Sequence, residues 1–242
     1  MVAKNRGGKR AGKTRAGSHP SGRSLRVRVK SARGRKASST RWLDRQLNDP
    51  YVREAKKLGY RSRSAFKLLQ LDDKFRLFRP GQKVVDLGAA PGGWTQVVKQ
   101  RAQMDAGRGR VVAVDIEPIE AVDGVVILCL DICDPLAPSL IFQALGGPAD
   151  VIISDMAAPL TGHKSTDHIR TGALCEEAHA LACELLGPGG ALVMKAFDGG
   201  THSDLMAAVK KNFDLVKTVK PEASRPESPE TYIVATGFRS GC

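Results

Sequence analysis

The chain has 242 residues, of which 42% are hydrophobic, 5% aromatic and 26% charged, and its net charge is +13. This composition is typical of a globular α/β protein with an aliphatic core, and the lack of any apolar run of roughly 18–20 residues excludes a membrane-spanning protein. The length allows one large domain with an appendage, or two small domains. The five cysteines are odd in number and show no disulfide-framework spacing, which favours a reducing compartment and therefore the cytoplasm.

The first 40 residues form a basic arm. They contain 13 Lys and Arg and no Asp or Glu, so residues 41–242 are balanced at 25 basic and 25 acidic side chains. Such a segment cannot bury enough apolar surface to fold alone, and we expect residues 1–40 to be disordered. A single-sign arm indicates a polyanionic partner, most simply nucleic acid. Two alternatives are a tail that only aids solubility and a mitochondrial transit peptide, although its many glycines suit a transit helix poorly.

Residues 41–79 are predicted to be helical and are also basic, with 11 Lys and Arg against 5 acids. Ser62 and Ser64 can cap a helix whose apolar side chains point inward. These apolar residues are Ala65, Phe66, Leu68, Leu69 and Leu71. Lys67 lies on the same helix, and Pro80-Gly81 then interrupts the chain.

Short apolar runs alternate with helical segments after this break. The predicted strands are 83–88, 110–116, 124–131, 150–156, 191–197, 214–220 and 231–238, and the predicted helices are about 92–104, 137–145, 166–186 and 202–213. Strand–helix alternation predicts a parallel sheet with helices on both faces, whereas the last two strands, with no helix between them, should pair antiparallel. We therefore predict an α/β, Rossmann-like domain over 41–242, with 80–242 as its core. Its mostly parallel seven-stranded sheet with an antiparallel C-terminal hairpin is similar in shape to a class I methyltransferase domain.

Five predicted strands end in a charged side chain, namely Asp86, Asp115, Asp131, Asp155 and Lys195. In an open α/β sheet the carboxyl ends of the strands line the ligand crevice, so these side chains predict a single site. Taken singly, each aspartate could equally be a helix cap or turn residue. Lys195 taken singly could extend its ammonium from the strand end into solvent.

The turn "DLGAAPGGWT" (86–95) follows the first of these strands and predicts the kind of ligand. Its glycines allow a ligand to approach the backbone. Trp94 stands where a phosphate-binding loop has its lysine, and Ala90 replaces the second glycine of the dinucleotide fingerprint. A ligand with ribose and adenine but no phosphates remains. Asp115 could accept both ribose hydroxyls and Asp131 the adenine amino group, which favours S-adenosylmethionine (SAM).

Five segments of the sequence resemble a known family. The matching segments are "GYRSRSAFKL" (59–68), "VVDLGAAPGGWTQ" (84–96), "VIISDMA" (151–157), "LVMKAF" (192–197) and "KPEASRPESPETYIVATGF" (220–238). Together they resemble the FtsJ/RrmJ family of ribosomal RNA 2'-O-methyltransferases across nearly everything outside the arm. The resemblance implies a catalytic tetrad of Lys67, Asp155, Lys195 and Glu230. It also implies that SAM is bound by Gly92, Trp94, Asp115, Asp131 and Asp155, with no metal.

The resemblance further implies methylation of a uridine ribose in large-subunit ribosomal RNA. The expected enzyme is a monomer that binds the ribosomal subunit through the arm and residues 41–79. Alternatives are a transfer-RNA or messenger-RNA-cap 2'-O-methyltransferase and a non-catalytic ribosome-assembly factor with the same fold. One departure from the family pattern is Pro159, which stands where relatives often have Asn, so a substrate contact made by that Asn is not expected here.

Lys195 could act in two ways. As a base it must be a neutral amine near pH 7, which requires desolvation or a neighbouring cation such as Lys67 to lower its pKa. Asp155 and Glu230 would favour its charged form instead and could orient it. The sequence leaves open whether Lys195 is a base or a steering cation.

Overall fold

The structure is a computed structural model that describes residue 27 and residues 37–103, 109–159, 161–199 and 203–239. The predicted arm, 1–40, lies outside the described residues except for Val27 and the first turn of α1. The helices are α1 (Ala37–Asn48), α2 (Pro50–Leu58), α3 (Ala65–Phe75), α4 (Gly93–Arg101), α5 (Ala137–Leu145), α6 (Lys164–Leu185) and α7 (Ser203–Asn212). The strands are β1 (Lys83–Leu87), β2 (Arg110–Asp115), β3 (Val126–Cys129), β4 (Ala149–Ser154), β5 (Leu186–Phe197), β6 (Phe213–Val219) and β7 (Glu230–Phe238).

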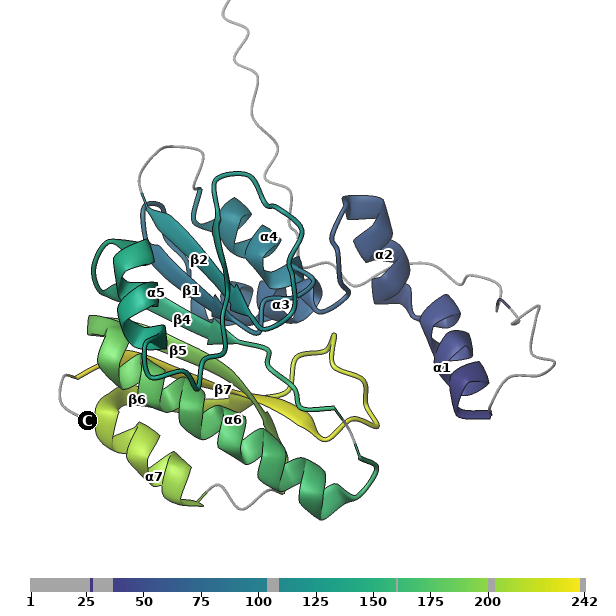
Figure 1. Ribbon diagram of the computed structural model, residues 1–242. Helices are drawn as coiled ribbons and strands as arrows, with labels where there is room; N and C mark the ends of the chain where they lie inside the picture. The colour runs from purple at the N-terminus through teal and green to yellow at the C-terminus, as the bar shows by residue number, and fades with distance from the viewer. Residues whose placement is uncertain (1–26, 28–36, 104–108, 160, 200–202, 240–242) are drawn as a thin grey trace, which may run out of the picture.

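The seven strands form one sheet in the order β3-β2-β1-β4-β5-β7-β6 (Figure 1). Strands β1 to β5 pair in parallel, and β7 is antiparallel to both β5 and β6. The predicted α/β fold with a mostly parallel sheet and an antiparallel C-terminal pair is therefore confirmed. Because β7 inserts between β5 and β6, Glu230 at its start lies opposite Phe197 at the end of β5.

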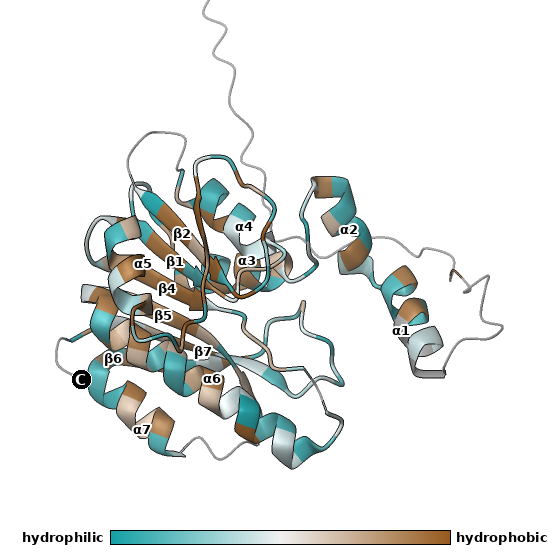
Figure 2. Ribbon diagram, in the orientation of Figure 1, coloured by the Kyte–Doolittle hydropathy of each residue, from teal (hydrophilic) through white to brown (hydrophobic). Residues whose placement is uncertain are grey.

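Two hydrophobic layers cover the two faces of the sheet, which explains the near-continuous apolar strands (Figure 2). Successive strand residues point to opposite faces: Val85 packs with α5, α6 and α7, whereas Val84 packs with α2, α3 and α4. Lys67 lies on the second face, on α3, and is only 7% exposed among the buried apolar side chains of that helix. Helix packing thus carries a lysine to the edge of the sheet where the strand-end charges lie.

Several element boundaries differ from the predictions by a few residues. Strand β5 begins at Leu186, before the Gly187-Pro188-Gly189 segment predicted to separate helix from strand, and its pairing with β4 shifts register there. Gly190 makes this irregular start possible, because a Cβ there would lie 2.9 Å from the Gly187 carbonyl oxygen. Strand β3 ends at Cys129, so Asp131 lies in the following turn.

The cysteines differ from expectation at one position. Cys129, Cys133 and Cys175 are free, whereas Cys183 is disulfide-bonded. Spacing along the chain does not reveal which sulfur atoms a fold brings together, so the expectation of unpaired cysteines is wrong for Cys183. Among the helices of the described residues, none combines the length and the apolarity needed to span a membrane.

Candidate active site

The sheet order arranges the strand-end charges in a row. Following β3, β2, β1, β4 and β5, the row runs Asp131, Asp115, Asp86, Asp155 and Lys195. Neighbouring strands lie about 4.8 Å apart, so the row extends over about 19 Å. The charges therefore form a line along one edge of the sheet rather than one cluster. One end of the line adjoins Lys67 and Glu230, and the glycine-rich turn follows β1 at its middle.

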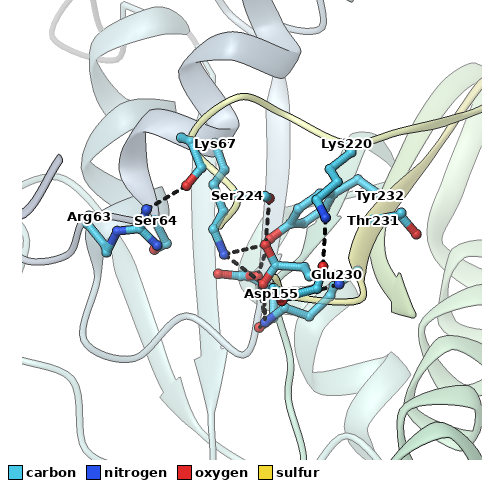
Figure 3. A network of polar contacts seen from close by, with 12 residues as sticks. Arg63, Ser64, Lys67, Asp155, Lys220, Ser224, Glu230, Thr231 and Tyr232 are labelled. Atoms are coloured by element: carbon cyan, nitrogen blue, oxygen red, sulfur yellow. Dashed lines mark hydrogen bonds and ion pairs between the residues drawn. The ribbon is translucent and has the colours of Figure 1, made fainter. Parts of the chain in front are cut away.

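A pair of buried charges joins α3 to β7. The Lys67 ammonium lies 2.6 Å from Oε1 of Glu230 and donates to Oε2 at 2.7 Å (Figure 3). Both side chains are about nine-tenths buried. The Ser224 hydroxyl donates to Oε1 at 2.7 Å, so the carboxylate is held from two sides. A bidentate, hydrogen-bonded pair of this kind has little freedom to change partner.

A second pair joins β5 to the end of β4. Lys195 Nζ lies 2.8 Å from Oδ1 of Asp155 and donates to the Asp155 backbone oxygen at 2.9 Å. The Tyr232 hydroxyl donates to the same Oδ1 at 2.7 Å (Figure 3). Oε2 of Glu230 lies 3.9 Å from Lys195 Nζ. The four residues predicted as a tetrad thus lie together as two ion pairs that touch through Lys195 and Glu230.

The electrostatics of the second pair favour its charged form. Burial alone would raise the pKa of Asp155, but the cations of Lys195 and Lys67 outweigh it and hold that pKa below its usual value. Burial alone would lower the pKa of Lys195, but Asp155 and Glu230 outweigh it and raise that pKa above 10.5. Lys195 is therefore an ammonium at neutral pH in the protein without ligands. The sequence had indicated this possibility, because Asp155 and Glu230 would favour its charged form.

The loop between β6 and β7 is fixed against the N-terminal helices. Arg63 donates to the Ala223 backbone oxygen at 2.6 Å and also pairs with Asp49, which pairs in turn with Arg225. Lys220 donates to two backbone oxygens of the same loop (Figure 3). The loop carries Ser224, so these contacts set the position of the hydroxyl that holds Glu230.

The glycine-rich turn and the end of β2 form a crevice rim. Both carboxylate oxygens of Asp115 accept backbone N–H groups, Oδ2 from Ala90 at 2.8 Å and Oδ1 from Glu117 at 2.9 Å. Gly92 has φ +105°, a conformation that strains other residues, and it leads into α4. The first N–H groups of α4 therefore lie beside the strand-end carboxylates. Free N–H groups at a helix start favour an anionic ligand group.

A buried carboxyl group lies at the centre of the row. Asp86 is 0% exposed; its Oδ2 accepts from the Thr95 hydroxyl at 2.6 Å, and its Oδ1 has no hydrogen-bond partner. Burial is the main reason that its pKa is raised to about 7, and the charges of Asp155 and Asp115 add to the shift. An unpartnered buried oxygen between two further carboxylates fits a ligand with a cationic group, and SAM has such a group.

Two of the residues predicted to bind the cofactor lie differently from the others. The Trp94 side chain is 2% exposed, donates from Nε1 to the Ser64 backbone oxygen, and packs on Tyr232 with ring centroids 5.6 Å apart. Only its backbone could therefore contact a ligand. Asp131 is exposed in the turn after β3 and accepts from the Cys133 N–H.

Two further residues of the site, Ser224 and Tyr232, lie in the matching segment 220–238. Their roles were not predicted, because only the fold shows the bonds of Tyr232 to Asp155 and of Ser224 to Glu230. Pro159, the departure from the family pattern, accepts from Arg170 through its backbone oxygen. The described residues include no group of three His, Cys, Asp or Glu side chains suited to hold a metal ion.

Comparisons with known proteins identify the family. The FtsJ-like methyltransferase family model matches residues 60–238. The chain belongs to the FtsJ-like methyltransferase family. The match includes all four residues of the tetrad and the whole glycine-rich turn, and it makes the protein a methyltransferase, as the sequence predicts.

Individual relatives extend the match into the N-terminal part. A protein of Paramagnetospirillum magneticum named ribosomal RNA large subunit methyltransferase E is 55% identical over 96% of this chain and 97% of its own length. A protein of Rhodospirillum rubrum with the same name is 51% identical over 98% and 92%. Among solved structures, one described as a ribosomal RNA methyltransferase from Plasmodium falciparum has a TM-score of 0.67 at 25% identity, covering 75% of this chain and 100% of that one.

Proposed function

We propose that this FtsJ-like methyltransferase transfers a methyl group from SAM to the 2'-hydroxyl of a uridine ribose in large-subunit ribosomal RNA. The proposal rests on two neighbouring ion pairs, Lys67 with Glu230 and Lys195 with Asp155. They lie beside a crevice in which the buried Oδ1 of Asp86 has no hydrogen-bond partner. The names of the relatives support ribosomal RNA of the large subunit as the substrate. The four side chains support the 2'-hydroxyl as the acceptor.

The cofactor would lie along the row of strand-end charges. We assign the ribose hydroxyls to Asp115, the adenine to Asp131 and the exposed side of Ile116 (66% exposed), and the amino-acid end to the backbone of Gly92 and Trp94. Asp155 lies beside Lys195 at the catalytic end of the row. When bound, SAM supplies a methyl group on a positively charged sulfur atom, which a nucleophile can displace.

Lys195 is proposed as the base. The reaction replaces an O–H bond by an O–CH₃ bond and releases one proton, so a group beside the ribose oxygen must take it. Asp155, with its pKa held below the usual value, is a poor acceptor, and Lys67 is fixed by both oxygens of Glu230. Lys195 becomes a strong base once it has lost its proton, and a positioned base contributes typically 10²–10⁴ in rate. Asp155, itself held by Tyr232, keeps Lys195 in place. Lys67 would face the ribose oxygen as a fixed cation.

The RNA would lie across the N-terminal part. We assign residues 41–242 to the methyltransferase domain, with 41–79 as its basic helical part, and residues 1–40 to an arm that contacts RNA phosphates. In Figure 1, α2 and then α1 extend away from the sheet, on the side where the loop that precedes β7 lies. The tetrad comes entirely from one chain, which supports action as a monomer, and a ribosomal substrate supports a cytoplasmic location.

Two other functions are weighed against this one. A transfer-RNA or cap methyltransferase would use the same tetrad, but the names of the relatives favour ribosomal RNA. A non-catalytic assembly factor with this fold is disfavoured because all four tetrad side chains are present and paired.

The deciding experiment measures methyl incorporation from labelled SAM into large ribosomal subunits, free ribosomal RNA and transfer RNA. We expect incorporation into the large subunit, at a single uridine ribose located by mapping the product. Incorporation into transfer RNA alone, or into a base, would contradict the proposal.

The arm is expected to contribute to RNA affinity but not to cofactor affinity. Removing residues 1–36 leaves α1 intact and deletes 13 basic side chains. Each lost phosphate contact to single-stranded RNA should reduce the slope of log K against log salt by about 0.7. Binding of RNA at several salt concentrations and calorimetry with S-adenosylhomocysteine (SAH) test this. An unchanged salt slope would mean that the arm does not contact RNA.

A further inference from the structure

We propose that Arg61 is a positioning residue for the cofactor, because it fastens together the two loops that form the crevice rim. The proposal rests on the function above only in taking SAM as the cofactor. Arg61 lies between α2 and α3, in the segment that leads to Lys67, and not on any strand end. Its guanidinium nevertheless reaches both the glycine-rich turn and the loop after β2.

The contacts of Arg61 are to backbone oxygens of both loops. Nη1 donates to the Glu120 oxygen at 2.6 Å and to the Pro91 oxygen at 3.3 Å, and Nη2 donates to the Ala121 oxygen at 2.8 Å. Oε2 of Glu120 lies 3.6 Å from Nη2. The side chain is only 20% exposed. A planar guanidinium has five N–H donors in a fixed geometry, so one side chain can bridge two loops through their backbone oxygens.

These contacts duplicate a bridge made from inside the crevice. Asp115 accepts from Ala90 in the glycine-rich turn and from Glu117 in the loop after β2. Arg61 joins the same two loops farther along, at Pro91 and at residues 120–121. The two loops are thus tied at both ends of the rim. If Asp115 binds the ribose, the outer bridge fixes the shape of the space that receives the nucleoside.

Arg61 is itself held firmly. Its backbone N–H donates to Oε1 of Gln96 on α4 at 2.9 Å, and Nε2 of the same glutamine donates to the Gly59 oxygen at 3.0 Å. A Cβ at Gly92 would lie 2.6 Å from Arg61 Nη1. The absence of a side chain at Gly92 therefore serves two purposes, since it permits the turn and leaves room for the guanidinium.

Arg63, two residues later, provides the contrast. It points to the other side of the segment, where it pairs with Asp49 at 2.9 Å and donates to the Ala223 oxygen in the loop that precedes β7. The two arginines thus contact different parts of the site. Arg61 binds the two loops of the crevice rim, and Arg63 binds the loop beside Glu230. Both lie directly before the helix that carries Lys67, so the segment 59–64 connects the two halves of the site.

The test is the affinity for SAH, measured by calorimetry on the full chain without RNA. Hydrogen bonds from a charged donor are stronger than neutral ones, so losing this bridge should weaken binding at least about tenfold in Arg61→Ala. Arg61→Lys, which keeps the charge but cannot reach both loops, should recover only part of the loss. Arg63→Ala is the matched control and should change the dissociation constant by less than about twofold.

A local measurement separates positioning from general destabilisation. Amide hydrogen exchange in Arg61→Ala should speed up in residues 89–92 and 117–122 and stay unchanged in the strands. An SAH dissociation constant of Arg61→Ala within twofold of the parent would overturn the proposal. An equal loss in Arg63→Ala would overturn it too, because the effect would then not be specific to the rim. Since no RNA is present, these outcomes are independent of whether the proposed RNA substrate is correct.

Discussion

Replacing Lys195 with alanine is expected to lower the rate of methyl transfer at least about a thousandfold, which is within the range for loss of a positioned base. The side chain is 9% exposed and its ammonium is held 2.8 Å from Asp155, so alanine removes an amine from a buried and fixed position. The affinity for SAH should change little, because Lys195 lies at the far end of the row from the adenine and ribose positions. Single-turnover transfer into large subunits and calorimetry with SAH measure the two quantities.

Folding must be controlled in this variant. Removing one partner of a buried ion pair costs about 3–5 kcal/mol, because Asp155 would lose the cation that contributes most to holding its pKa low. Lys195→Met keeps the aliphatic stem and should be equally inactive, and circular dichroism with a denaturation curve checks both proteins. Lys217→Ala, at an exposed position of β6, is the matched control and should transfer at the parent rate. Residual transfer within tenfold of the parent in both Lys195 variants would exclude Lys195 as the base.

Most of the fold could be predicted from the sequence because the strands are apolar and β-branched and the helices between them are long enough to be recognised. The alternation of strands and helices predicted the parallel sheet, and the short β6–β7 connection predicted the antiparallel pair. The insertion of β7 between β5 and β6 could not be predicted from spacing, since a hairpin can add to a sheet by either of its strands. That insertion is what brings Glu230 next to Lys195.

The site was predictable in its members but not in its pairings. A lysine at the end of an apolar strand and aspartates at four other strand ends are visible in the sequence. Which acid faces which lysine depends on side-chain directions that only the packing of α3 and β7 fixes, and it is this pairing that joins Lys67 to Glu230. The row of charges was predicted as one site, whereas the strand order spreads it along an edge. The bridge made by Arg61 had no sequence signal, because its partners are backbone oxygens.

The rate of methyl transfer is expected to rise with pH. The pKa of Lys195 lies above 10.5 in the protein without ligands, because Asp155 and Glu230 outweigh the effect of burial. Below its pKa, the fraction of a lysine that is a neutral amine increases tenfold for each pH unit. If Lys195 is the base, the single-turnover rate at saturating SAM should therefore rise about a hundredfold between pH 6.5 and 8.5, without a plateau. A flat profile would instead identify Lys195 as a cation that only orients the ribose oxygen.

Asp86 titrates in the same range and must be separated from Lys195. Burial raises its pKa to about 7, so its carboxyl group loses its proton as pH rises through neutrality, which should strengthen the binding of a cationic cofactor. The affinity for SAM, whose sulfur is positively charged, should accordingly increase from pH 6 to 8 in the parent and become nearly independent of pH in Asp86→Asn when measured by calorimetry without RNA. At saturating SAM this effect disappears from the rate, whereas the effect of Lys195 remains. The two pH dependences thus assign one titrating group to cofactor binding and the other to proton transfer.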